Sequence, residues 1–264
     1  MTVSLPALAA LLLSLAGAPA VLGPTALTAS PSTATSPASR PAAAAAVTVV
    51  QATPGMSVDV SIDGDPVLSA AASGQVSQAI ELPPGTHEVE FSDADSGLDV
   101  TSSLVVEEGS RSDVVLHRPA SVDGDPVVSS YATPTEPIGQ GKARVLVAHT
   151  AVVPPADVRV DGQTVFTNIA NGEFATADVP SGTHEVALLP TGSTRDPILG
   201  PLDLTVPQGT VTMVYAVGSP RNGSMDVILH GARLRPTRTS EPDTIKTGSA
   251  GLARAWVVRG FGSR

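Results

Sequence analysis

The chain has 264 residues, 42% of them hydrophobic, which is enough for the cores of one or two domains. Its formal net charge of −10 argues against nucleic-acid binding, because contacts to phosphate need a basic surface. The absence of cysteine excludes disulfides, thiolate metal sites and a cysteine nucleophile. Aromatic residues make up only 3% and charged residues 15%, a composition that favours strands and turns, so we expect an all-β fold.

The N-terminus reads MTVSLPALAALLLSLAGAPA, an apolar stretch followed by the small residues Ala18-Pro19-Ala20. This pattern predicts a secretory signal peptide over residues 1–20, although no Lys or Arg precedes the apolar stretch, so the signal is atypical or the true start lies upstream. Residues 21–45 are mostly Ala, Ser, Thr and Pro, which predicts a disordered linker. No other segment reaches the ~18 apolar residues of a membrane span, so we expect no transmembrane segment in the mature chain.

Beyond the linker the sequence repeats itself. VTVVQATPGMSVDVSIDG, from Val47, aligns with VLVAHTAVVPPADVRVDG, from Val145, at a constant offset of 98 residues. Later segments keep the same order with small length changes at turns, which is typical of duplicated domains. We therefore expect a first domain at 46–134, a linker at 135–142 and a second domain at 143–232, with a basic and disordered tail at 233–264.

Each copy alternates apolar and polar residues with a period of two, as Val58, Val60 and Ile62 do against their neighbours. Asp-Gly, Ser/Asn-Gly and Pro-x-Gly turns separate these segments. Seven or eight short strands in about 90 residues predict a β-sandwich of immunoglobulin-like size in each copy. Because the linker is short, we expect two tandem sandwiches that sit as beads with restricted freedom.

A His-Glu pair occurs in both copies, within PPGTHEVE and PSGTHEVA. A zinc-protease motif needs HExxH on a helix, but the fourth residue after each His is Phe91 or Leu188, so the pattern does not fit. On a strand, His87 points to the same side as Phe91. We therefore expect His87 and His184 to fill amphipathic core positions, with a ring nitrogen bonded to a turn carbonyl.

Other candidate sites are weak. Asp93, Asp95 and Asp99 faintly resemble a calcium loop, but the bidentate Glu is missing and the second copy has TGSTRDP there, so a solvated hairpin tip is the simpler interpretation. No nucleophile elbow, phosphate loop or dinucleotide motif is present, and His117, His149 and His230 fall into no local ligand spacing. We expect no catalytic residues and no cofactor.

The tail from Gly231 onward has seven Lys or Arg residues against Glu241 and Asp243, whereas the rest of the chain is acidic. These basic residues could contact anionic wall polymers or phospholipid, or the tail could have no partner.

Two motifs carry a resemblance to a known family. The first is D-V-x-V/I-D-G, at 59–64 and 157–162, and the second is L/V-P-x-G-T-H-E-V, at 82–89 and 179–186. Their order is similar to that in the domain of unknown function 4397 family of secreted, mainly actinobacterial proteins. The resemblance covers about residues 46–232 as two tandem copies, the first of which departs from the pattern after Gly109. It implies secretion and a β-sandwich fold, and it implies no activity.

Together these features favour an exported, non-enzymatic cell-envelope protein with a structural, adhesive or protein-interaction role, either secreted or envelope-associated. Its partner would be a cell-wall polymer or another surface protein. The alternative is a module that binds a small ligand or calcium through its loops. A hydrolase with its site between the domains rests on no motif, and the sequence does not determine the oligomeric state.

Overall fold

The structure is a computed structural model that describes residues 43–121 and 124–234. These residues form strands and no helix, and the strands build four sheets of four strands each, so the all-β prediction is confirmed. The predicted signal peptide and most of the predicted linker and tail lie outside the described residues. Within the described residues, no helix has the length and apolar character to cross a bilayer.

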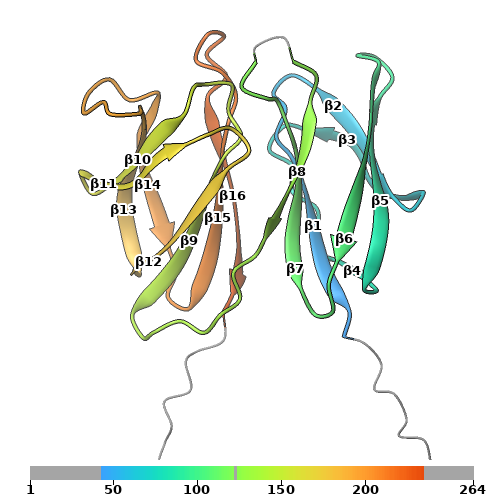
Figure 1. The fold of residues 1–264 in the computed structure, drawn as a ribbon, viewed down its shortest axis with the longest axis horizontal. Coiled ribbons are helices and arrows are strands. Elements are labelled where there is room, and N and C mark those ends of the chain that lie inside the picture. Colours follow the sequence, from blue (N-terminus) through green and yellow to red (C-terminus); the bar gives the residue numbers. More distant parts are fainter. Residues whose placement is uncertain (1–42, 122–123, 235–264) are drawn as a thin grey trace, which may run out of the picture. The chain divides into compact units, whose positions relative to one another are not determined.

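The first eight strands build the first sandwich (Figure 1). They are β1 (Ala45–Gln51), β2 (Ser57–Ile62), β3 (Asp65–Ala72), β4 (Ile80–Leu82), β5 (Gly85–Asp93), β6 (Leu98–Val106), β7 (Arg111–His117) and β8 (Val127–Ala132).

The next eight strands build the second sandwich. They are β9 (Lys142–His149), β10 (Ala156–Val160), β11 (Gln163–Ile169), β12 (Phe174–Pro180), β13 (Gly182–Pro190), β14 (Leu199–Val206), β15 (Thr210–Val217) and β16 (Asp226–Arg233).

Both sandwiches have the same strand order. One sheet of each has the order β4-β1-β7-β8 or β12-β9-β15-β16, and we call these two the junction sheets. The other sheet has the order β3-β2-β5-β6 or β11-β10-β13-β14, and we call these the outer sheets. In both junction sheets the first strand of the sandwich pairs parallel with the seventh, β1 with β7 and β9 with β15. This shared topology is what a duplicated domain predicts.

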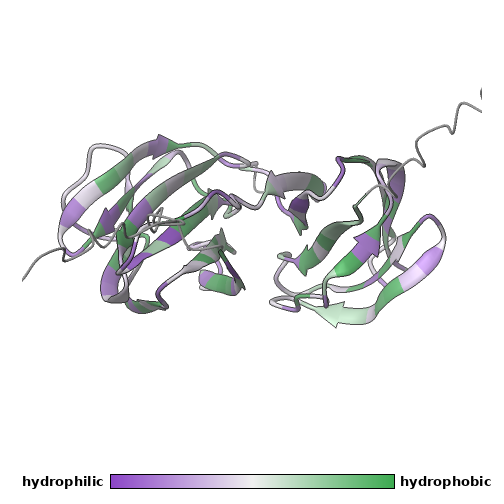
Figure 2. Ribbon diagram, turned by 90° about the horizontal axis from the view of Figure 1, so that it is seen from below, coloured by the Kyte–Doolittle hydropathy of each residue, from purple (hydrophilic) through white to green (hydrophobic). Residues whose placement is uncertain are grey.

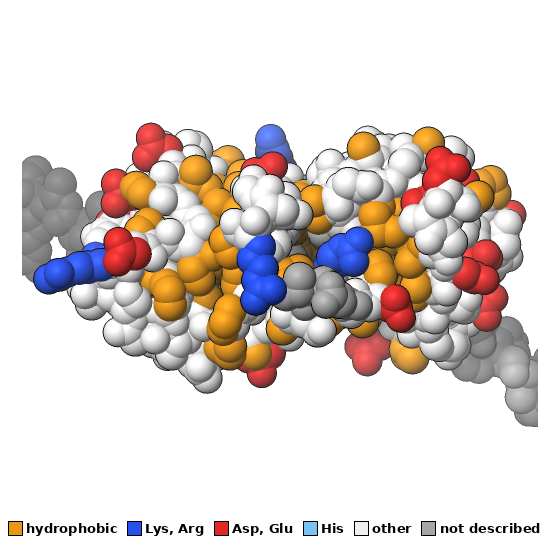
Figure 3. Space-filling view, turned by 90° about the horizontal axis from the view of Figure 1, so that it is seen from above, with side chains coloured by type: hydrophobic (Ala, Val, Ile, Leu, Met, Phe, Trp, Pro, Cys, Tyr) orange, Lys and Arg blue, Asp and Glu red, His pale blue; other side chains and the backbone are white. Residues whose placement is uncertain are grey.

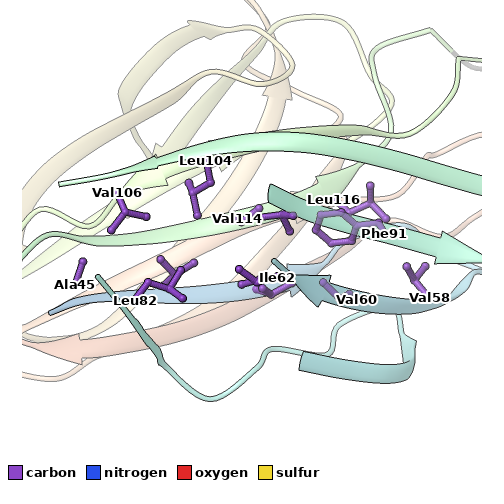
Figure 4. Packing of buried hydrophobic residues seen from close by; sticks show 13 residues of the cluster. Ala45, Val58, Val60, Ile62, Leu82, Phe91, Leu104, Val106, Val114 and Leu116 are labelled. Carbon is purple, nitrogen blue, oxygen red and sulfur yellow. The ribbon is translucent and has the colours of Figure 1, made fainter. Parts of the chain in front are cut away.

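Hydrophobic and hydrophilic residues alternate along several strands (Figure 2), and this period-two alternation turns one face of such a strand toward a core. In β2, Val58, Val60 and Ile62 are buried while Asp59 is exposed. Figure 4 shows the apolar side chains of the first sandwich meeting between its two sheets, with Phe91 and Leu116 among the largest. A separate cluster of buried residues fills the second sandwich.

A third core lies between the two junction sheets. It combines residues of both sandwiches: Val50, Ala52, Val115, Tyr131, Ile138, Leu146, Ala148, Val211, Met213, Tyr215, Val217, Ile228 and Leu234. Strands β7 and β15 are consequently buried on both faces, each contributing alternate residues to its own sandwich and to the junction. The two sandwiches therefore share an apolar junction in the described residues, a contact that the expectation of two beads with restricted freedom did not include.

Candidate functional site

The repeated histidine of each sandwich is held between a turn aspartate and a proline carbonyl oxygen, an arrangement that we call the clamp. His87, on β5, is 7% exposed, and its Nε2–H donates to the carbonyl oxygen of Pro83 at 2.9 Å. Its Nδ1 lies 2.6 Å from Oδ2 of Asp63, in the Asp-Gly turn between β2 and β3. Both partners only accept hydrogen bonds, so both ring nitrogens donate and the ring is an imidazolium. The bond to Asp63 and the bond to Pro83 raise the pKa of His87.

The second sandwich has the same clamp. Nε2 of His184 is 2.8 Å from the carbonyl oxygen of Pro180, and Nδ1 is 2.7 Å from Oδ2 of Asp161. Hydrogen bonding to Asp161 is the main cause that raises the pKa of His184, and bonding to His184 lowers the pKa of Asp161. With both nitrogens engaged, neither histidine offers a lone pair to a metal.

The aspartates of the clamps explain why the turn sequence is repeated. Asp63 and Asp161 have φ of 52° and 50°, a left-handed conformation that Asp tolerates better than most residues and that a two-residue hairpin turn requires. Their second carboxylate oxygens accept the backbone N–H of Glu88 and Glu185, at 2.9 and 3.0 Å. The predicted bond from the histidine to a turn carbonyl is confirmed, and the aspartate partner is an addition that sequence reasoning missed.

The structure does not gather the three weak calcium candidates into one site. Oδ1 of Asp93 accepts the N–H of Asp95 at 3.0 Å, and Oδ2 accepts the Ser96 hydroxyl at 2.6 Å. The bond from Ser96 is the largest cause that lowers the pKa of Asp93. Asp99 lies on β6, opposite Ser92. Within the described residues, no group of three or more His or acidic side chains is placed to hold a metal ion.

The most unusual polar group is Asp113, which is 1% exposed in the junction core. The hydroxyl of Tyr215, from the second sandwich, donates to Oδ2 of Asp113. Nε2 of His230 lies 2.5 Å from the same oxygen. Burial and the Asp113 carboxylate raise the pKa of the Tyr215 hydroxyl well above its ordinary value, so this hydroxyl stays protonated and donates. The carboxylate of one sandwich is thus satisfied by two side chains of the other.

Aromatic contacts continue this cluster through the junction. Tyr131 lies with its ring centroid 5.6 Å from that of Tyr215 and 5.8 Å from that of Phe174. The rings of Tyr215 and His230 are stacked at 6.3 Å. The Tyr131 hydroxyl donates to the carbonyl oxygen of Gly172 at 3.3 Å, and burial raises its pKa to about 12. Aromatic side chains of both sandwiches therefore contact one another across the junction.

Two further histidines lie buried in the described part of the chain. Nδ1–H of His117 donates to the carbonyl oxygen of Arg118, and Nε2 accepts the Ser129 hydroxyl, both at 2.9 Å. Burial lowers the pKa of His117 and of His149, so both rings are neutral. Nε2–H of His149 donates to Pro154 O at 3.2 Å, while its Nδ1 has no partner among the described residues. The amide of Asn171 bridges the sandwiches through Arg118 O and Ala151 O.

A cleft of about 660 Å³ opens at one side of the junction core. It lies between β1, β4 and β7 of the first sandwich and β16 of the second, and Asp113 and His230 form part of its lining. A second hollow of about 570 Å³ shares Ala46, Glu81, Arg111 and Arg233 with it, so the two form one longer cleft. This cleft, which no local sequence motif marks, is a candidate binding site.

The charge around the cleft differs from that of the first sandwich as a whole. No Lys or Arg occurs between residues 41 and 110, and acidic side chains (red) are spread over the first sandwich in Figure 3. Arg111, the first residue of β7, and Arg233, the last of β16, nevertheless line the same cleft from the two sandwiches. The cleft can therefore offer guanidinium donors on an otherwise acidic protein.

The fold defines the chain as an all-β protein of two joined β-sandwiches. Residues 45–156 match the model of a family described as domain of unknown function (DUF4397). This match covers the first sandwich and continues through β9 to the start of β10. No curated protein matches the chain.

Proposed function

We propose that this chain is an exported, non-enzymatic protein of the cell envelope, built from two tandem copies of the DUF4397 domain that act as one structural or adhesive unit. The observation that carries the proposal is the junction core, in which Asp113, Tyr215 and His230 join the two sandwiches. A shared core resists separation of the two domains, which suits a protein that transmits load or presents a surface.

Two observations support the assignment of a second copy of the domain. Both sandwiches have the same strand order, and both have the same contacts of a histidine with an aspartate and a carbonyl oxygen. The proposal that the protein is exported rests on the resemblance of residues 1–20 to a signal peptide.

The histidines favour a non-enzymatic role. His87 and His184 use both ring nitrogens in structural bonds. His230 faces the cleft with its Nε2 on Asp113, and no Ser or Thr hydroxyl among the described residues bonds to its ring. A hydrolase of the Ser-His type needs that contact. The loop-based calcium alternative is weakened because Asp93 uses both carboxylate oxygens within its own turn.

Fractionation of cells that express the full chain with a tag tests this proposal. We expect the protein in the culture fluid or the wall fraction, and retention of the purified chain on isolated cell walls. A cytoplasmic location would refute export. Labelling of the purified chain by a broad serine-hydrolase probe, lost in His230→Gln, would refute the non-enzymatic assignment.

A further inference from the structure

The cleft at the junction has an open strand edge along one wall. β16 is the edge strand of its junction sheet, where it pairs only with β15. The N–H of Thr150, which follows β9, donates to the carbonyl oxygen of Ala216 on β15, so the peptide group of Ala216 faces β9. Peptide groups alternate in direction along a strand, so that of Tyr215 faces β16 on the other side. Tyr215 pairs with Ile228, so the peptide group of Ile228 faces β15. Since β15 and β16 pair without a register shift, every second residue after Ile228 does the same, and the peptide groups of Leu229, Gly231 and Arg233 point toward the free edge.

The opposite wall is a part of the first junction sheet that the second sandwich leaves uncovered. On β1, Val47 and Val49 point into the core of the first sandwich, so Ala46 and Thr48 point to the junction side. Val50 is buried in the junction core, whereas Ala46 and Thr48 are only partly buried and line the cleft. Their small side chains leave a volume of about 660 Å³, within the range of ligand pockets, ~300–1,000 Å³.

The charged groups of the cleft favour an acidic ligand. Arg144 is held by Asp178 and Glu136, but Arg111 and Arg233 form no ion pair within the described residues. The carboxylate of Asp113 is already engaged by Tyr215 and His230, which leaves Glu81 as the exposed carboxylate of the cleft. The lining of the cleft therefore contains two arginines without an ion pair in the described residues and one exposed carboxylate, and guanidinium groups pair readily with carboxylates.

We propose that the cleft binds an extended peptide with acidic side chains, which adds as a further strand to β16 and pairs its carboxylates with Arg111 and Arg233. Strand addition supplies main-chain hydrogen bonds to Leu229 and Gly231, and the arginines select for acidic side chains. The chain's own C-terminal segment carries the wrong sign, since basic residues outnumber acidic ones from Gly231 onward. The ligand is therefore an acidic segment of a different protein. This inference goes beyond the proposed function and does not depend on the location of the protein.

A titration of the ¹⁵N-labelled full chain tests the proposal, with the blocked peptide acetyl-Thr-Glu-Val-Glu-Val-Thr-amide as the probe. We expect amide shifts confined to β16, β1, β4 and the start of β7, and slower amide exchange at Gly231 and Leu229. The double variant Arg111→Gln/Arg233→Gln should weaken binding on the order of tenfold, as expected for two partly exposed ion pairs. The matched control Arg195→Gln/Arg221→Gln removes the same charge from exposed positions away from the cleft and should bind like the original chain.

Three comparisons separate strand addition from simpler binding. A peptide with Lys in place of Glu should bind at least several-fold more weakly, and a peptide with alternate N-methyl groups should not slow exchange at Gly231. Equal binding of the Lys peptide, or full binding by the N-methylated peptide, would overturn the proposal. If inorganic phosphate alone reproduced the β16 shifts at the same affinity, the cleft would be a small-anion site and strand addition would be refuted.

Discussion

Replacing Tyr215 by Phe removes the hydroxyl that donates to the buried carboxylate of Asp113, without changing the shape of the ring. The bond joins one sandwich to the other, so its loss weakens the junction directly. A hydrogen bond to a charged group contributes ~1.5–3 kcal/mol, and removing one partner leaves a buried acceptor less satisfied. We therefore expect Tyr215→Phe to lower the free energy of unfolding by about 2 kcal/mol.

The matched control is Tyr131→Phe in the same core. The Tyr131 hydroxyl donates to a neutral carbonyl oxygen, that of Gly172, at a long distance of 3.3 Å. We expect its loss to cost about 0.5 kcal/mol, at the low end for a hydrogen bond between neutral groups. Both variants keep the aromatic contact between the two rings, so the difference between them isolates the charged partner.

Urea unfolding of the full chain, followed by far-ultraviolet circular dichroism, measures both costs. A double-mutant cycle of Tyr215→Phe with Asp113→Asn should give a coupling energy above about 1 kcal/mol, because the two side chains touch. If Tyr215→Phe cost no more than Tyr131→Phe, the Asp113 cluster would not hold the sandwiches together.

The clamps predict a pH dependence. The pKa values of His87 and His184 are raised above 6.5, so the stability from the clamps is fully present below about pH 6.5 and is lost as the pH rises through the folded pKa values. The melting temperature should fall over that range, and the double variant His87→Gln/His184→Gln should flatten the fall; an equal fall in the variant would contradict the assignment. For calcium, we expect the same melting temperature with calcium and with EDTA, whereas a calcium-dependent rise that Asp93→Asn abolishes would support the loop-based alternative. Phe91 is fully buried in the first sandwich, so Phe91→Ala should lower the free energy of unfolding by about 3–5 kcal/mol in urea; a cost below 1 kcal/mol would show that this core is misassigned.

Much of each sandwich could be predicted from local patterns. The alternation around Val58 and Val60 placed β2, and the Pro-x-Gly turn before His87 placed β5 with that side chain on the buried face. These predictions hold because period-two burial and turn chemistry are set within a few residues. The immunoglobulin-like assignment stays a prediction, and so do the domain boundaries.

The junction could not be predicted in the same way. Asp113 meets Tyr215 and His230 only after two domains pack together, and no local spacing records a contact of that range. A signal was nevertheless present. The segment of β15, TVTMVYAV, is a nearly continuous apolar run, and β7 contains the shorter run Val114–Leu116, a pattern that indicates strands buried on both faces. Read in that way, they would have predicted a partner for the outward side of each junction sheet.

The parallel pairing in the junction sheets also sets an order of events during synthesis. β1 is made first, but its partner β7 follows more than sixty residues later, as the pairing of Ala46 with Arg111 shows. The face of β7 that carries Val115 then waits for β15, which is made about a hundred residues later still. During that interval the apolar stretch Val114–Leu116 would be prone to aggregate, and a neighbouring charge opposes this. Asp113 supplies such a charge, so we expect the residue that later joins the two sandwiches also to oppose premature association of the unfinished chain.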